Sequence, residues 1–600
     1  MARAMLFGSV LLASCAMLCG TAPAQVAAPA PPQDNIIVVQ GQLDKLSGWR
    51  EAETDHVVVI SDGGEGELRR IAHNLERLDF LLSVLLGRGD LQGAPPKLRL
   101  TLVGDPTAFD TMNLQSLRFT PGPYRRGFNV TGYFDPREDG PVMAMTRFDS
   151  RLQIEHGTSL ALILPDLVRA TSSDPQDPEG PAAAARLASG PINPGNVAFA
   201  PQATPEGDVN GMSVPVTAES RIYAAFARNF LLTHFPNAYP KWYVDGFGEL
   251  FSTMSVKADG QIEYGRAPEG YAKVLDAVSD ISIRDVLSGK YLQAHAADSR
   301  WTPYHAWALA HMLFFSEVRR PQLMRYLAAF AAGQPSLQAA QAFGDLDALQ
   351  REFVRYDSGK LAYERVTYPP EDAGEPVIRR LTEGEAAFVK GRLELGSRLG
   401  FALFPTTQGA ASSTRAITAG EAWLSDLRRQ AGRYPGNYQA QMLLAEAECR
   451  SGHAEACSAA AQRALGIRPE SSDALSWSGT AMLMQALSRP APERVAQLRL
   501  ARSAIGRANR RDPENPLPLI AYYRSFADAG EAPPEIAVDG LGKVVDLVPA
   551  APEPRLLLGD ALIRRGDHIG ARRALLPIAN GDYAAPEQAA ARALLDKAGG

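Results

Sequence analysis

The chain has 600 residues, which exceeds what one hydrophobic core usually organises, so we expect several domains. Hydrophobic residues make up 46% of the chain and charged residues 21%, which is typical of globular proteins and argues against a disordered or fibrous chain. The formal net charge is -6, so the sequence offers no basic footprint for nucleic acid and we expect no nucleic-acid partner.

Residues 1–24 have the pattern of a secretory signal peptide. Arg3 precedes an apolar run that ends in small residues at Ala22 and Ala24, which predicts cleavage after Ala24. A lipid anchor at Cys15 is an alternative, because the Leu-Ala-Ser-Cys segment that ends there resembles a bacterial lipobox. Both alternatives predict export to the periplasm or cell envelope.

The segment after the export signal is expected to be unstructured. Residues 25–42 are rich in Pro, Ala and Gln and lack periodicity, which is typical of a flexible spacer. No later segment reaches the roughly 20 consecutive apolar residues that a membrane-spanning helix needs, so we expect no transmembrane segment in the mature chain.

Residues 43–150 are expected to form a small α/β unit. His56–Ile60 reads as a buried strand, and Leu98–Val103 reads as a second one. Between them a helix is predicted by apolar residues that share one face: Leu68, Ile71, Leu75, Leu78, Leu82 and Leu85. Residues 151–217 are dense in Pro, Gly, Ala and Asp and are expected to be an insertion or irregular loop.

Helical periodicity returns at residue 218 and continues with interruptions to residue 365. Within it, a helix containing residues 221–234 is followed by Trp242-Tyr243-Val244-Asp245-Gly246-Phe247-Gly248-Glu249. This layout resembles the catalytic helices of gluzincin-type (peptidase MA-like) metallopeptidases and related domains of unknown function. These carry HExxH on one helix and a Trp-x-x-Glu-Gly-x-x-Glu segment on the next. The resemblance covers roughly residues 45–365 and implies a metallopeptidase-like helical domain over 218–365.

The same resemblance implies that the zinc site is lost. Ala224 and Arg228 stand where the two histidines of the motif would be, Ala225 stands where its glutamate would be, and Asp245 takes the place of the third ligand, with Glu249 nearby. Zinc hydrolysis needs neutral imidazoles to hold the metal and a general base for the bound water. We therefore expect no catalytic residue, no cofactor and no metal at this place.

An arginine at a former ligand position suggests what replaces the metal. Our hypothesis is that Arg228 and Asp245 form an ion pair that substitutes structurally for zinc; the alternative is that Arg228 points to solvent. None of the nine histidines forms an i, i+4 pair with another. His305 and His311 share a helix but face opposite sides, which favours core or surface roles over metal binding.

Residues 366–420 are expected to be a linker and helix, and residues 421–600 to be an all-α array of helix pairs. Prolines 469, 513 and 549 punctuate the array, and its small packing positions resemble those of tetratricopeptide (TPR) repeats: Ala445, Cys457, Ala461, Ala464, Gly559, Gly566 and Ala571. This resemblance implies a solenoid with a concave groove for polypeptides. Cys449 and Cys457 allow either a disulfide or two separate buried thiols.

Taken together, these features predict an α+β N-terminal and middle part with a metallopeptidase-like core, followed by a TPR-type solenoid. The favoured function is a pseudoenzyme: a non-catalytic exported scaffold that binds a polypeptide partner through the TPR groove or the degenerate cleft. The array could instead only brace the preceding domain. The rival function is a hydrolase that uses an unrecognised metal site or a metal-free mechanism.

Overall fold

The computed structural model describes residues 44–88, 95–105, 108–112, 114, 132–155, 200–201, 211–268, 282–289, 302–357, 361–369, 374–398, 414–583 and 585–599. The expected export signal with Cys15, the spacer and most of 151–217 lie outside these residues. None of the helices in the described ranges is long and apolar enough to cross a membrane.

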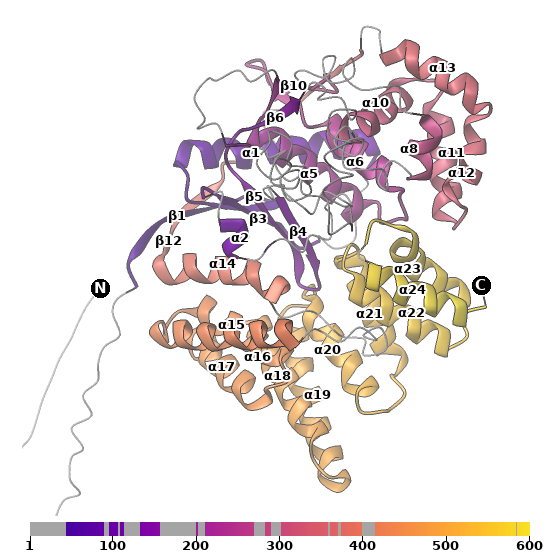
Figure 1. Cartoon of the computed structure of the whole chain (residues 1–600). Coiled ribbons are helices and arrows are strands. Elements are labelled where there is room, and N and C mark those ends of the chain that lie inside the picture. The colour runs from indigo at the N-terminus through magenta and orange to yellow at the C-terminus, as the bar shows by residue number, and fades with distance from the viewer. Residues whose placement is uncertain are drawn as a thin grey trace, which may run out of the picture. The chain divides into compact units, whose positions relative to one another are not determined.

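A six-stranded sheet forms the N-terminal α/β part (Figure 1). In spatial order its strands are β12 (Val377–Thr382), β1 (Leu46–Glu53), β2 (Val57–Ser61), β3 (Leu98–Val103), β5 (Gly140–Thr146) and β4 (Gly132–Arg137). β2, β3 and β5 are parallel, whereas the other neighbours are antiparallel. The α/β unit expected from the sequence is therefore present, and a strand from far along the chain, β12, completes its edge.

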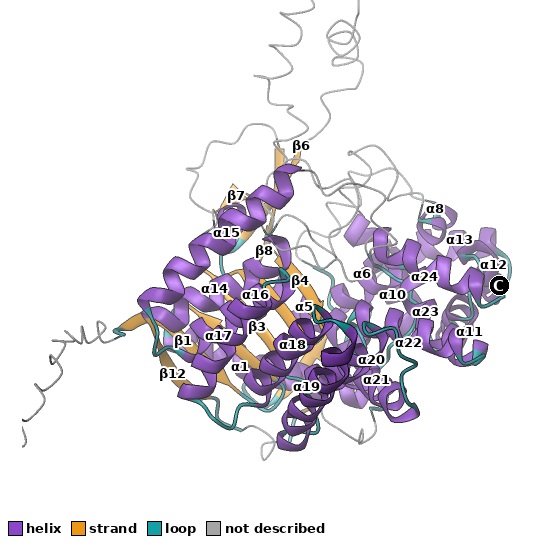
Figure 2. Ribbon diagram, turned by 90° about the horizontal axis from the view of Figure 1, so that it is seen from below, coloured by secondary structure: helices purple, strands orange, loops and turns teal. Residues whose placement is uncertain are grey.

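Both faces of this sheet are covered, because its strands carry apolar residues on both sides. Helix α1 (Glu65–Leu86) links β2 to β3 and buries Leu68, Leu75 and Leu82 against one face, as its periodicity predicted. Helix α14 (Glu383–Arg398) covers the other face, where its Leu393 packs with Val142 of β5. Figure 2 shows α14 lying across the strands.

The middle of the chain is helical and packs on α1. Its helices are α5 (Ala218–His234), α6 (Lys241–Leu250), α8 (Ile283–Ser288), α10 (Thr302–Phe315), α11 (Arg320–Ala331), α12 (Ser336–Ala339) and α13 (Leu346–Asp357), with the 3-10 helix η3 (Ala340–Phe343). The short helix α2 (Ala108–Thr111) lies between β3 and β4 and packs with the cluster that includes Leu393 of α14. Two three-stranded sheets accompany them: β6 (Ser150–Glu155) with β7 (Ala200–Pro201) and β8 (Gly211–Val216), and β10 (Gln261–Tyr264) with β9 (Ser255–Val256) and β11 (Glu364–Thr367). The fully buried rings of Trp242 and Trp307 belong to one continuous apolar core that also includes α1.

Helices α6 and α10 pack closely at Gly246, and this contact yields a first prediction. A Cβ added there would lie 2.3 Å from the carbonyl oxygen of Ala306 and 2.7 Å from Ala310 Cβ. Gly246→Ala is therefore expected to lower the free energy of unfolding by about 1 to 3 kcal/mol, measured by urea denaturation. Gly542→Ala is the matched control, since nothing lies within 4 Å of its added methyl group. A stability of Gly246→Ala equal to that of the control would contradict the packing described.

The C-terminal part consists of consecutive helices that pack side by side (Figure 1). They are α15 (Thr414–Arg433), α16 (Tyr438–Arg450), α17 (Ala454–Ile467), α18 (Ser472–Leu487), α19 (Ala491–Arg511), α20 (Pro516–Ala527), α21 (Glu535–Leu547), α22 (Pro552–Arg564), α23 (His568–Asn580) and α24 (Ala585–Lys597). Small residues allow close approach of paired helices, as at Gly559, whose added Cβ would meet Leu575 at 2.5 Å. The expected all-α C-terminal stretch is present.

One helix pair is joined covalently. Cys449 near the end of α16 and Cys457 in α17 form a disulfide, with their Cα atoms 5.1 Å apart. Of the two alternatives that the sequence left open for these cysteines, the structure contains the disulfide.

Candidate functional site

Helices α5 and α6 bring three of the sequence-identified residues together. Arg228 of α5 places its Nη2 2.9 Å from Glu249 Oε1 and its Nε 3.9 Å from Asp245 Oδ1, both on α6. The Asp245 side chain is 7% exposed, while those of Arg228 and Glu249 are about one quarter exposed. Arg228 thus bridges two carboxylates at the contact of the two helices. Its role as a substitute for zinc remains a prediction.

The local sequence explains why an arginine fits there. Thr217 caps α5 by accepting a hydrogen bond from the Ser220 backbone N–H, which fixes the start of the helix. On α6, a Cβ at Gly248 would lie 2.6 Å from Arg228 Nε and 2.8 Å from the carbonyl oxygen of Ala224. The missing side chain at Gly248 therefore leaves the space through which Arg228 reaches Asp245 and Glu249.

The two alanines of the expected site provide packing. Ala224 is 1% exposed, and Ala225 is partly buried against the central core. Neither offers a metal ligand or a base. Within the described ranges, no group of three or more His, Cys, Asp or Glu side chains is arranged to hold a metal ion.

Two further charged residues belong to this cluster, and sequence analysis missed both. Lys241, at the start of α6, places its Nζ 3.3 Å from the Asp245 carboxylate and 2.8 Å from Asp582 Oδ2. Asp582 lies in the connection between α23 and α24, more than 300 residues along the chain. We call Arg228, Lys241, Asp245, Glu249 and Asp582 the buried charge cluster. No local pattern relates Lys241 to Asp582, so only the fold could reveal their contact.

The cluster contains three carboxylates and two cations. Burial raises the pKa of Glu249, and Arg228 offsets this in part. Burial likewise raises the pKa of Asp582, opposed by Lys241. Burial disfavours the Lys241 ammonium, but Asp245 and Asp582 outweigh it and raise the pKa of Lys241. The carboxylates therefore keep Lys241 charged, and Arg228 lies within ion-pair distance of Asp245 and Glu249. This arrangement fits a structural ion-pair network.

Two histidines near this region, His311 and the half-buried His234, contact other side chains of the core. His311 is fully buried, with Nε2 2.7 Å from the Gly265 carbonyl oxygen and Nδ1 2.6 Å from Tyr356 Oη. Because a carbonyl only accepts, Nε2 carries the proton and Nδ1 accepts from the tyrosine. His234, the last residue of α5, stacks on Phe230 with ring centroids 4.4 Å apart.

The buried His311 gives a second prediction, on pH. Burial lowers the pKa of His311 to about 4, below the ordinary value of 6.5, so the unfolded chain binds more protons between these values. Stability from this group is therefore complete above about pH 6.5 and is lost as the pH falls toward 4. His311→Gln is expected to flatten the fall of Tm between pH 7 and pH 4.5, while the exposed His568→Gln leaves it unchanged. Identical slopes in the wild type and His311→Gln would refute this.

The helical array contacts the sheet through an acidic turn, Glu138–Asp139, which joins β4 to β5. Arg450 of α16 places Nη2 3.1 Å from Glu138 Oε2, and Arg392 of α14 pairs with Asp139. Glu553 of α22 lies next to Glu138, and burial together with this neighbouring carboxylate raises the pKa of Glu553. The turn therefore contacts α16 and α22 of the array and α14, the helix that covers the sheet, which favours the alternative that the array braces the preceding domain.

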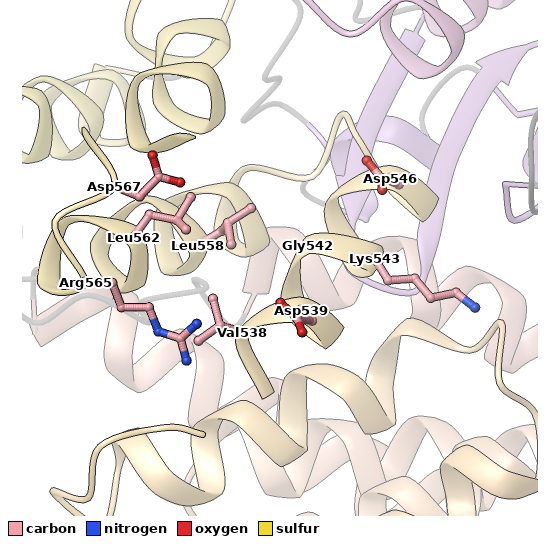
Figure 3. A pocket seen from close by; sticks show the side chains of 9 residues that line it. All are labelled: Val538, Asp539, Gly542, Lys543, Asp546, Leu558, Leu562, Arg565 and Asp567. Atoms are coloured by element: carbon pink, nitrogen blue, oxygen red, sulfur yellow. The ribbon is translucent and has the colours of Figure 1, made fainter. Parts of the chain in front are cut away.

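A separate surface pocket of about 620 Å³ lies between α21 and α22 (Figure 3). Leu558, Leu562 and Val538 give it an apolar floor, and acidic and basic side chains alternate around them: Asp539, Lys543, Asp546, Arg565 and Asp567. Lys543 pairs with Glu514 at 2.6 Å. The mixed charge of this rim selects no particular class of ligand, and we assign the pocket no role.

Comparisons with known proteins place few constraints on this chain. No family model matches it, and no curated protein matches it. It is similar to a thermophilic TPR protein of Thermus thermophilus whose crystal structure is known, with 19% identity, 31% of this chain and 92% of that chain covered, and a TM-score of 0.26. Since this TM-score is too low to carry an argument, the TPR interpretation depends on the helix pairs themselves. These comparisons give no support to the gluzincin resemblance.

Proposed function

We propose that the chain is a non-catalytic, exported scaffold protein with a gluzincin-like domain whose zinc site has been lost and a TPR-type array, and that it mediates protein–protein contacts in the cell envelope. The observation that carries the proposal is the position of Arg228, whose guanidinium bridges Asp245 and Glu249. These are the two carboxylates that the resemblance leaves for binding a cation.

The physical argument is electrostatic. A guanidinium within 4 Å of a carboxylate neutralises it and repels a divalent cation from the same place. Lys241 contacts Asp245 from the other side at 3.3 Å, so the carboxylate is already bound by two cations. Zinc hydrolysis would also need imidazole ligands and a general base, and Ala224 and Ala225 provide neither.

The disulfide supports the exported location. Disulfides persist in oxidising compartments such as the bacterial periplasm and are rare in the cytosol of mesophiles. Cys449 and Cys457 are bonded in the structure. This agrees with the export signal expected in residues 1–24, whether it is cleaved after Ala24 or lipidated at Cys15.

A peptidase assay on the full chain tests the non-catalytic proposal against the rival hydrolase. We expect no hydrolysis of unfolded casein above a buffer blank, with or without added zinc, in the wild type and in Asp245→Asn alike. Hydrolysis that a chelator or Asp245→Asn abolishes would show that the cluster is a working metal site and would overturn the proposal.

A further inference from the structure

We propose that the face formed by α14, α16 and α22 is a carboxylate-recognition site for an acidic turn, occupied in this structure by the chain's own Glu138 and Asp139, and that a partner with an acidic turn binds there by displacing it. This inference rests on the proposed scaffold function, and it names the chemistry of the polypeptide partner.

The first argument is that each carboxylate of the turn has its own arginine, one on α16 of the array and one on α14. Arg450 contacts Glu138 at 3.1 Å, and Arg392 pairs with Asp139. The side chains of Glu138 and Arg450 are 11% and 13% exposed, so this recognition takes place largely away from water. Charge-assisted hydrogen bonds from planar guanidinium groups to carboxylates are among the strongest in proteins.

The second argument is that the arginines are held in place by the array itself. Glu446 of α16 lies between them, with its carboxylate 2.9 Å from Arg450 and 3.4 Å from Arg392. A shared acidic neighbour orients both guanidinium groups before any ligand arrives, which reduces the entropy cost of binding. The two arginines therefore form a preorganised pair rather than two independent surface charges.

The third argument is that the arginines contact the tip of the turn. At its base, Arg137 is neutralised by Asp135, with Nε 2.6 Å from Oδ2, and donates to the Leu393 carbonyl oxygen. At the tip, Glu138 contacts Arg450 and Asp139 pairs with Arg392. Two consecutive acidic residues on a turn are therefore the ligand feature that the site selects.

Glu553 is the third side chain next to the acidic turn, and its pKa depends on the charge of Glu138. Burial and the neighbouring Glu138 raise the pKa of Glu553 well above its ordinary value. Arg524 of α20 lies 3.9 Å from Glu553. The other charged groups around Glu138, Asp139 and Glu553 are Arg450 and Glu446 of α16, Arg392 of α14 and Asp473 of α18. A ligand carboxylate at the Glu138 position would meet the same arginine and the same Glu553 side chain.

Chemical rescue in the full-length protein tests the site. Glu138→Ala removes the resident carboxylate and is expected to lower Tm; 100 mM sodium acetate should restore at least half of that loss, whereas sodium chloride of equal ionic strength should not. Adding Arg450→Gln in the same chain should abolish the rescue. If Glu138→Ala does not fold, the same test is made with Asp139→Ala, and with Arg392→Gln added to it in the same chain. Equal effects of acetate and chloride, or rescue that survives loss of the arginine, would overturn the proposal.

A peptide experiment tests displacement. The probe is a fluorescein-labelled synthetic peptide copying residues 134–142, and its control carries Gln and Asn in place of the two acidic residues of the tip. Binding is measured by fluorescence anisotropy. The double variant Glu138→Ala/Asp139→Ala should bind the acidic peptide with a Kd at least tenfold lower than that of the wild type. It should bind the control peptide no more tightly than the wild type does. Equal binding by both proteins, or of both peptides, would reject the site. Such a result would leave the peptidase assay, and with it the non-catalytic proposal, unaffected.

Discussion

Replacing Lys241 by Met is expected to lower the free energy of unfolding by about 3 to 5 kcal/mol, the largest effect that we predict for a single substitution. Lys241 is the only cation within 4 Å of Asp582 in the described structure and lies 3.3 Å from Asp245, so its loss leaves two carboxylates buried next to each other. Urea denaturation followed by circular dichroism measures the change.

The matched control is Lys543→Met. Lys543 also forms a short ion pair, 2.6 Å from Glu514, but both side chains are more than 40% exposed. Exposed pairs contribute at most about 1 kcal/mol, so this variant should remain close to the wild type. The double variant Lys241→Met/Asp582→Asn should recover part of the loss, because it removes one of the stranded charges. If the two lysine substitutions lower the free energy of unfolding equally, the ion pairs of the buried charge cluster do not stabilise the contact between α6 and the array.

The second large effect is expected for Arg228→Met, at about 2 to 4 kcal/mol. This is somewhat less than for a fully buried pair, because the Arg228 side chain is 26% exposed. The loss follows from leaving Glu249 and Asp245 without the guanidinium that bridges them. Arg228→Lys keeps the charge but not the fork that reaches both carboxylates, and it should fall between the wild type and Arg228→Met.

Arg499→Met on α19 is the control for general loss of an arginine, since Arg499 is exposed. It should leave the urea midpoint unchanged within error. If Arg228→Met behaves in the same way, Arg228 is not a structural part of the cluster, and the alternative that it points to solvent gains support.

Periodic segments of the fold could be predicted from the sequence, because their pattern records local burial. The strand over 57–61, predicted over 56–60, follows from a continuous apolar run. The apolar face of α1 follows from 3.6-residue spacing, and the strand over 98–103 was also predicted from its apolar residues. The helices that carry Arg228, Asp245 and Glu249 were identified by a motif frame, and the structure brings these three side chains together.

Contacts between distant segments could not be predicted, because no local pattern encodes them. β12 pairs with β1 across more than 300 residues, and the segment expected to be a linker and helix supplies both this strand and α14. The contact between the acidic turn of the sheet and Arg450 of the array could not be predicted either, since Arg450 and Glu138 are 312 residues apart. A single glutamate or arginine in a polar stretch of sequence is predicted to be exposed to solvent unless its ion-pair partner is known.

The buried charge cluster and the acidic turn connect the array to the rest of the chain in similar ways. At both places a cation of one part is buried against carboxylates of another, at 2.8 Å for Lys241 with Asp582 and 3.1 Å for Arg450 with Glu138. Buried ion pairs add little net stability compared with apolar packing, but they are costly to break one partner at a time. The placement of the array against the rest of the chain therefore depends on specific charged contacts.

The most direct test of the central claim is the metal content of the wild-type protein after dialysis against excess zinc and then against metal-free buffer, measured by mass spectrometry. If Arg228 and Lys241 hold the carboxylates that stand at the metal-binding positions of gluzincins, far less than one zinc ion per chain should be retained. One zinc per chain, lost on substitution of Asp245 or Glu249, would contradict the account.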